Sequence, residues 1–417
     1  MGLWTQADAL NRWLSGPAVL PRLQRLAILY GLLFLATTVA VSIVTPGLVY
    51  GSGGVIGADF LAFYTAGDMT LQGRAIEAYD FAAFDAALQS RVENDHLGMM
   101  WQYPPLMFVI AGLLALMPYK ISFWVWMTAT CAAFAWALNR IVQTVQPDWA
   151  GRRVTLLLIL ASPISVSIMT NGQISLLTAA LLMLAAFRPR RDWLVAGLAA
   201  GLLTMKPQLG ILIPLAYLVA GAWRAFAVAA MTGAALHLLS ILVFGPESLA
   251  AFFAAVARLQ ADVAGGGVHT PPVSMTTVFG QLRLWDVPSG VALPVQYVMA
   301  VLVIAIVVYL WWQRRDDDKQ ALYLASLLSS GAILVTPYAY AYEMTALAIA
   351  AVWMAFQSGP YRRFSILILS GFWLALALRR FVPPDFVLQI PFLTAISVFV
   401  LLACAGFHRP KSVSDEA

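Results

Sequence analysis

The side chains of this chain that could do chemistry are few, and they lie in short polar stretches between long apolar runs. Asp59, in the stretch GADFLAFYTAG, follows the first apolar run, and Asp68 lies nine residues further on. A carboxylate of this kind can take a proton from a hydroxyl group. Lys206 and the pair Arg379 and Arg380 carry the opposite charge, which can stabilise a phosphate group. Ionisable groups at membrane depth are costly, so they are candidates for a functional site.

Each of these residues also has a plainer interpretation. Asp59 could cap the helix that FLAFYTAGDMTL is expected to form, and Lys206 could extend from a helix end to lipid headgroups. Asn171 and Gly172 suit a tight turn, which would leave Gln173 as an ordinary first residue of the next helix. The sequence leaves both interpretations open for each position.

Two further polar features are less specific. His269 lies beside two prolines and is typical of an ordinary loop residue. The run Asp316–Asp318 resembles a metal-binding acidic cluster, but we expect it in a solvated loop on the opposite side from Asp59.

The composition indicates a membrane protein. Of the 417 residues, 61% are hydrophobic and 11% charged, with a mean hydropathy of +0.80, whereas soluble domains carry roughly 25% charged residues. The net charge of +5 is typical of cytoplasmic loops rich in Lys and Arg, and no nucleic-acid partner is expected. Both cysteines lie inside apolar runs, so no disulfide framework is predicted.

The topology depends on the apolar segment 104–118. At 1.5 Å per residue it reaches only about 22 Å, short of the roughly 30 Å hydrocarbon core, so we expect a re-entrant or interfacial helix. With that choice, 17 of the 25 Lys and Arg residues fall on the cytoplasmic side, which agrees with the positive-inside rule. If the segment crossed, every later loop would change sides. The polar residues named above would then leave the extracytoplasmic face.

The predicted fold is therefore an all-α, polytopic integral membrane protein with about twelve crossings and both ends in the cytoplasm. Residues 1–25 form a cytoplasmic or interfacial segment, 26–406 a single transmembrane domain, and 407–417 a cytoplasmic tail. The first extracytoplasmic loop, 47–103, carries a charge of −5 and is expected to hold one or two amphipathic helices within 74–92, while 245–291 is expected to be a second outer loop. The predicted crossings are 26–46, 121–142, 154–170, 174–187, 193–206, 207–222, 225–244, 292–312, 320–336, 343–357, 364–378 and 386–406.

Four motifs in this order resemble bacterial glycosyltransferase family 87. They are DFLAFYTAGDMTLQGRAIEAYD, WQYPPL, ASPISVSIMTNGQISLL and GLLTMKPQLGILIP. The resemblance covers about 26–400, although beyond about 245 it is one of general layout. It implies the GT-C architecture and a relationship to polyprenyl-phosphate-mannose-dependent mannosyltransferases of the bacterial cytoplasmic membrane.

The resemblance, which assigns Asp59 and Pro104–Pro105, and the chemistry of a lipid-phosphate sugar donor, which suggests the others, together imply roles for particular residues. Asp59 matches the essential aspartate of the first outer loop and would be the base, with Asp68 as the alternative. Lys206, helped by Arg379 and Arg380, would bind the donor phosphate. The remaining sugar- or substrate-binding candidates are Tyr64, Tyr79, Tyr103, Asn171, Gln173, Gln208 and His269, and Pro104 and Pro105 would mark the lipid groove.

The expected partners are a polyprenyl-phosphate sugar, a glycan or glycolipid acceptor in the cell envelope, and the lipid bilayer. Many relatives have a second acid where this chain has Gln173, so no metal or other cofactor is expected; the alternative is a bound divalent ion. The sequence does not specify the sugar; a hexose, mannose above all, or a pentose would fit. The alternatives are a secondary transporter or lipid flippase, which should show an internal repeat that we do not find, and a noncatalytic envelope-assembly protein.

Overall fold

The computed structural model describes residues 19–50, 54–92, 98–265, 275–356, 365, 368 and 384–408. Nearly all of these residues are helical, and the described β-structure is one antiparallel pair of two-residue strands with an isolated bridge between Met275 and Tyr340. The strands are β1 (Val49–Tyr50) and β2 (Gly54–Val55). The all-α class predicted from the sequence is confirmed.

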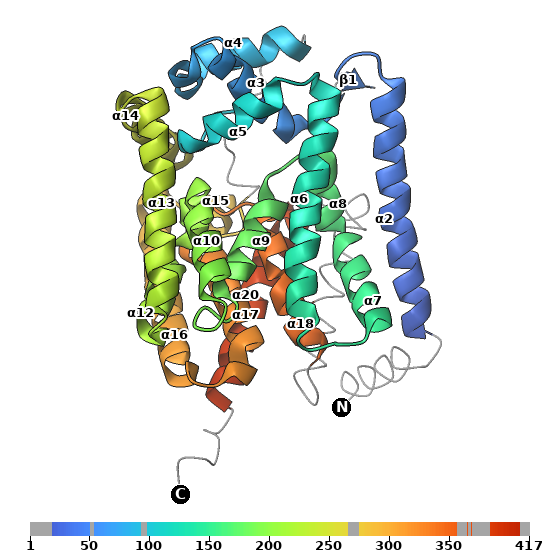
Figure 1. Cartoon of the computed structure of the whole chain (residues 1–417), viewed down its shortest axis with the longest axis vertical. Helices are drawn as coiled ribbons and strands as arrows, with labels where there is room; N and C mark the ends of the chain where they lie inside the picture. Colours follow the sequence, from blue (N-terminus) through green and yellow to red (C-terminus); the bar gives the residue numbers. More distant parts are fainter. Residues whose placement is uncertain are drawn as a thin grey trace, which may run out of the picture.

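Most helices stand side by side in one bundle, as Figure 1 shows. Their bounds are α2 Val19–Val44, α6 Tyr119–Val142, α7 Trp149–Leu160, α8 Pro163–Asn171, α9 Ser175–Ala186, α10 Trp193–Leu202, α11 Pro207–Gly210, α12 Leu212–Ala220, α13 Trp223–Phe244, α16 Ser289–Arg314, α17 Ala321–Val335, α18 Ala348–Ala355 and α20 Pro384–His408. Short 3₁₀ helices join some of them: η2 Leu203–Met205, η4 Asp318–Gln320 and η5 Ala341–Leu347. Every residue of α17 is buried, as expected for a helix that is apolar all round, whereas much of α2 and α13 is exposed.

The number of crossings is the part of the predicted fold that the structure does not confirm. Among the described residues, four helices are long and apolar enough to cross a membrane, namely α6, α13, α16 and the 389–407 part of α20. The pair α7 and α8, bent by 60°, makes a fifth candidate. The other predicted crossings correspond to apolar helices of 10–17 residues or, for most of 364–378, lie outside the described residues.

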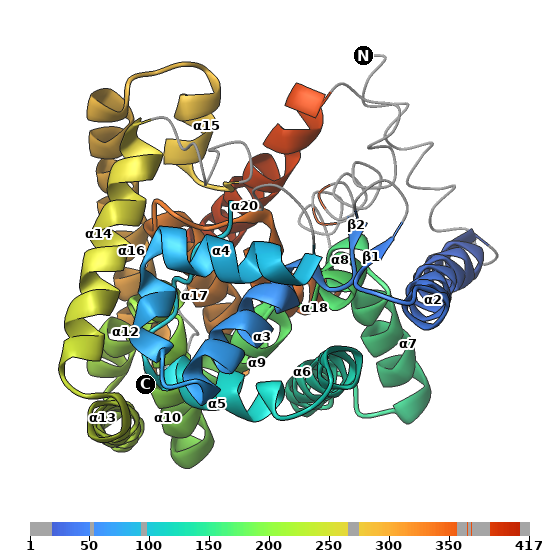
Figure 2. The same ribbon diagram turned by 90° about the horizontal axis from the view of Figure 1, so that it is seen from above.

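A second group of helices lies across one end of the bundle. It contains α3 (Ala58–Leu71), η1 (Ala75–Tyr79), α4 (Phe81–Val92) and α5 (Leu106–Ala115). Figure 2 shows α2, α6 and α13 nearly end-on, while α3 and α4 are seen along their length. The ten residues of α5 extend about 15 Å, so this helix cannot cross a bilayer. Its length and position agree with the interfacial or re-entrant helix predicted within 104–118.

The segment 245–291 differs from the outer loop that we predicted. It contains two helices, α14 (Glu247–Gly265) and α15 (Val278–Leu284). In α14 the apolar side chains of Phe252, Leu259 and Val263 are buried on one face, which is the pattern of an amphipathic helix. The segment is therefore partly helical, and its place on the outer face stays a prediction.

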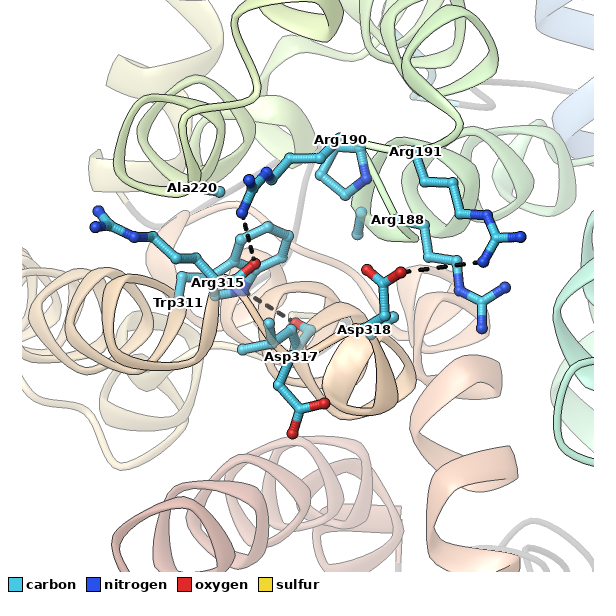
Figure 3. A pocket seen from close by; sticks show the side chains of 12 residues that line it. Arg188, Arg190, Arg191, Ala220, Trp311, Arg315, Asp317 and Asp318 are labelled. Atoms are coloured by element: carbon cyan, nitrogen blue, oxygen red, sulfur yellow. Dashed lines mark hydrogen bonds and ion pairs between the residues drawn. The ribbon is translucent and has the colours of Figure 1, made fainter. Parts of the chain in front are cut away.

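The opposite end of the bundle carries arginine-rich loops. Arg190 pairs with Asp316 and Arg191 lies 4.0 Å from Asp318, so the turn between α9 and α10 is linked to the turn between α16 and α17. Figure 3 shows these side chains around a small pocket whose wall includes Trp311. The acidic run Asp316–Asp318 is thus largely paired with arginines at the end far from Asp59, as an ordinary charged loop would be.

Candidate active site

Asp59 lies in the first turn of α3, where the N-terminal end of the helix favours a negative charge. Its carboxyl group is in a sheltered position, and burial raises its pKa to about 6. The positive charge of Lys206 and a side-chain hydrogen bond from Gln173 act in the opposite direction and lower the pKa. Asp59 can therefore titrate close to neutral pH, as a general base needs to do.

The turn between α8 and α9 brings Gln173 to this carboxyl group. Gly172 ends α8 with φ 72°, and its carbonyl accepts a hydrogen bond from Trp126 Nε1 at 3.0 Å. A Cβ atom at Gly172 would lie 2.5 Å from Cβ of Phe60, the neighbour of Asp59. The Oε1 atom of Gln173 accepts from the backbone N–H of Ile174 at 3.1 Å, which leaves its amide NH₂ to donate to Asp59.

We expect Gly172→Ala to destabilise the protein by roughly 2–5 kcal/mol. The left-handed backbone costs a non-glycine residue about 1–2 kcal/mol, and overpacking against Phe60 adds about 1–3 kcal/mol. Gly73→Ala is the matched control, because Gly73 has φ 76° but open space around its Cβ position. The measurement is unfolding of both variants in the same detergent. Equal losses would show that the close approach at Gly172 contributes nothing.

Lys206 lies where the chain breaks between η2 and α11. The following residue, Pro207, disfavours helical backbone at Lys206, which adopts φ −141° and ψ 70°. The side chain is buried, with 5% of the residue exposed, and its ammonium forms an ion pair with Glu343, which is 2% exposed. The ammonium also lies 4.9 Å from the centre of the Tyr342 ring, a cation–π geometry. Lys206 is therefore held inside the protein and does not extend to the headgroups.

Tyr103 completes this cluster. Its ring packs on Phe63 and Trp101, with centroids at 4.8 and 5.1 Å. Burial raises its pKa well above the usual value, and the negative charges of Glu343 and Asp59 raise it further. Its phenol therefore stays protonated near the two carboxylates. The cluster of Asp59, Gln173, Lys206 and Tyr103, all predicted site residues, with Glu343 is called the Asp59 cluster below.

Asp68 lies at the other end of α3. Its carboxylate pairs with Arg91 and accepts a hydrogen bond from Gln72 Nε2 at 2.7 Å. Nine helical residues separate it from Asp59, about 13 Å along the axis. The guanidinium of Arg91 also lies 5.3 Å from the centre of the Tyr64 ring, and the Tyr64 hydroxyl donates to the Met117 carbonyl at 2.9 Å. Asp68 and Tyr64 thus belong to a separate group of contacts at the other end of α3.

Several other predicted residues are placed away from an open site. Tyr79 is buried with 4% exposed, and its hydroxyl donates to the Tyr103 carbonyl at 2.7 Å, so its ring is packed inside the protein. Asn171 and Gln208 are half-buried at the end of α8 and in α11. His269, Arg379 and Arg380 lie outside the described residues.

An apolar groove of about 910 Å³ lies between α5 and α13. Exposed leucines and valines form much of its wall, and the ion pair of Arg74 with Glu77, at 2.6 Å, lies in its lining. The apolar wall residues include Val109, Leu113, Leu116, Leu239 and Val243. Pro104 and Pro105 are instead buried at the start of α5. They begin the helix that supplies part of the wall but do not themselves line this groove.

Glu343 is a member of the cluster that the sequence motifs did not point to. The signal that could have found it is a single acid between YAYAY and a long apolar run, because an acid there needs a partner. In the part of the chain that the structure describes, no three His, Cys, Asp or Glu residues converge as metal ligands would. Among the described residues, the Lys206 ammonium acts on Asp59, and this ammonium is paired in turn with the Glu343 carboxylate.

The fold and the cluster define a helical membrane protein with a sheltered carboxylate and a buried lysine under helices that cover one end of the bundle. The family model of glycosyltransferase family 87 matches residues 101–337, more than half of the chain. The chain therefore belongs to glycosyltransferase family 87, which indicates a glycosyltransferase. Neither a search of curated proteins nor a search of solved structures gave a match. The matched region contains Tyr103, Gln173 and Lys206, whereas Asp59 and Glu343 lie outside it.

Proposed function

We propose that this protein transfers a hexose, most readily mannose, or a pentose from a polyprenyl-phosphate donor to a hydroxyl group of an envelope glycan or glycolipid. The reaction takes place on the extracytoplasmic face of the bacterial cytoplasmic membrane. The observation that carries the proposal is the sheltered Asp59 carboxylate beside the buried Lys206 ammonium, at the end of the bundle opposite the arginine-rich loops. The excess of arginine at that far end supports a cytoplasmic orientation for it.

The chemistry is a single displacement with inversion at the anomeric carbon. The acceptor hydroxyl oxygen attacks this carbon while Asp59 takes the hydroxyl proton. The bond from the anomeric carbon to the phosphate oxygen breaks, and its electron pair leaves with the polyprenyl phosphate. This phosphate is a good leaving group, so one carboxylate base suffices. Lys206 stabilises the negative charge that grows on the phosphate, and Gln173 orients the Asp59 carboxylate.

The groove between α5 and α13 suits the prenyl chain of the donor. Its wall is apolar and belongs to helices at the periphery of the bundle (Figure 2), where a lipid chain could enter from the side. Burial of each chain methylene there contributes about 0.8 kcal/mol. The proposal includes no resident metal or organic cofactor, because the ammonium of Lys206 supplies the positive charge.

The test is to incubate the purified protein with several polyprenyl-phosphate sugars and an envelope extract, with and without a chelator. We expect one donor to release polyprenyl phosphate and to label a glycan or glycolipid, equally in both conditions. If no donor is consumed with any acceptor extract, the transferase proposal fails. Movement of a lipid or solute across vesicles containing the protein would then point to a transporter or flippase.

The acid limb of the pH profile of kcat/KM should have its midpoint near pH 6. Only ionised Asp59 can accept the hydroxyl proton, so activity is present above its pKa of about 6 and is lost as the pH falls through that value. An ordinary aspartate would place the limb near pH 4. The measurement is initial rates at subsaturating donor from pH 4 to 8. Gln173→Leu should move the limb upward, because it removes a hydrogen bond that favours the carboxylate; a limb below pH 5 in the unaltered protein would contradict the assignment.

A further inference from the structure

Glu343 is the buried charged residue of the Asp59 cluster to which the mechanism gives no part. It lies in η5, and its backbone N–H donates to the Tyr340 carbonyl at 2.9 Å, which fixes the start of this turn. Its carboxylate forms the ion pair with Lys206, and both side chains are almost fully buried. Removing a charge from water is costly, so such a pair persists only where geometry compensates for the loss.

Without Glu343, the Lys206 ammonium could pair with the Asp59 carboxylate instead. Its side chain is a flexible four-carbon stem that ends in a compact charge, and the charge already acts on Asp59 strongly enough to lower the pKa of that carboxyl. An ammonium that moved onto Asp59 would occupy the lone pairs that must accept the hydroxyl proton. Glu343 on one side and the Tyr342 ring on another hold the ammonium in a fixed place.

We propose that Glu343 is a positioning residue that retains the Lys206 ammonium and so keeps the Asp59 carboxylate available as the base. This inference rests on the proposed transferase function for its kinetic consequence, but the arrangement of charges can be measured without catalysis. Among the described residues, the Lys206 ammonium after η2 and the Gln173 amide between α8 and α9 act on the Asp59 carboxyl group directly. The phenols of Tyr103 before α5, Tyr119 in α6 and Tyr342 in η5 lie close enough to be affected by the Asp59 charge. Glu343 in η5 is linked to this group through its ion pair with Lys206.

The first test is Glu343→Gln, which keeps the shape of the side chain and removes its charge. The released ammonium should move toward Asp59, so the protonation of Asp59 should shift to lower pH and kcat should fall about ten-fold, since a weaker base transfers protons more slowly. A purely structural loss would lower the yield of folded protein without moving the titration of Asp59.

The second test asks whether Glu343 acts through Lys206. In the double variant Lys206→Met with Glu343→Gln, no buried ammonium remains, and the shift to lower pH should disappear. Two variants that act through one contact should not have additive effects. The double variant also leaves no unpaired charge of the ion pair in the interior. It should therefore fold, and its Asp59 titration can be measured even if Glu343→Gln alone folds poorly. Asp316→Asn, which removes an ion pair at the far end of the bundle, is the control and should leave the titration unchanged.

The readout is the carboxylic-acid C=O stretch of Asp59 in infrared difference spectra recorded against pH, assigned by its absence in Asp59→Asn. A lower midpoint in Glu343→Gln that reverts in the double variant supports the inference, even if no sugar donor is consumed. An unchanged midpoint in Glu343→Gln, or a shift that persists without Lys206, overturns it. Failure of every donor in the transfer assay, by contrast, overturns the proposed function alone.

Discussion

Asp59→Asn is expected to lower the rate of sugar transfer by about 10²–10⁴-fold, the usual contribution of a general base. Asparagine has nearly the same shape and can still bond to Gln173, but it cannot take the acceptor proton. The protein should therefore fold and bind donor as before. The measurement is kcat for release of polyprenyl phosphate, with thermal unfolding in detergent as the check on folding.

Asp68→Asn is the comparison for this result. It removes the partner of Arg91 at the other end of α3 and should cost stability more than turnover. If Asp68→Asn loses transfer while Asp59→Asn retains it, Asp68 is the base. If both variants keep full activity, neither carboxylate acts on the acceptor and the proposed mechanism is wrong.

Lys206→Met should lower kcat/KM for the donor by about 10²–10³-fold, the effect of removing one preorganised electrostatic contact to the developing charge. The substitution keeps the length and apolar stem of the side chain. It also leaves the buried Glu343 carboxylate unpaired, which costs roughly 3–5 kcal/mol of stability. The measurement is steady-state kinetics with the donor varied, together with the unfolding transition.

The double variant Lys206→Met with Glu343→Gln separates these two effects. Its stability should recover because no charge of the pair remains buried, while its donor kinetics should stay impaired. Recovery of activity together with stability would show that Lys206 only balances Glu343. Lys206→Arg should retain part of the activity, since a guanidinium can also bind phosphate but with a different shape.

The sequence could predict that Asp59, Gln173 and Lys206 lie at the same end of the bundle, because the side on which a turn lies depends on segment length and charge. A segment of 15 residues is too short to cross, and that fact assigns the later turns to sides. In the structure the Lys206 charge and a Gln173 hydrogen bond both act on Asp59. The three residues are far apart along the chain, but the predicted topology still placed them on the same side.

The partner of Lys206 could not be predicted in the same way. Topology places Glu343 on the correct side, but side-chain packing decides which of several polar residues there meets the ammonium. The helix α14 was missed for another reason. The turn-rich GGGVHTPPVS dominated the interpretation of 245–291, although Phe252, Leu259 and Val263 before it have helical spacing. The number of crossings depends on helix ends, and breaks such as the 60° bend between α7 and α8 are weakly encoded in an apolar run.

The position of the groove between α5 and α13, at the flank of the bundle, has a consequence for how enzyme kinetics should be read. A ligand that reaches the protein sideways is diluted by neighbouring lipid molecules, not by the volume of water around the vesicle. Its effective concentration is then a mole fraction within a two-dimensional solvent. Curves of transfer rate against donor, recorded at different amounts of detergent or phospholipid, should therefore coincide when the donor is expressed as a mole fraction of the lipid. They should diverge when the donor is expressed as a molar concentration.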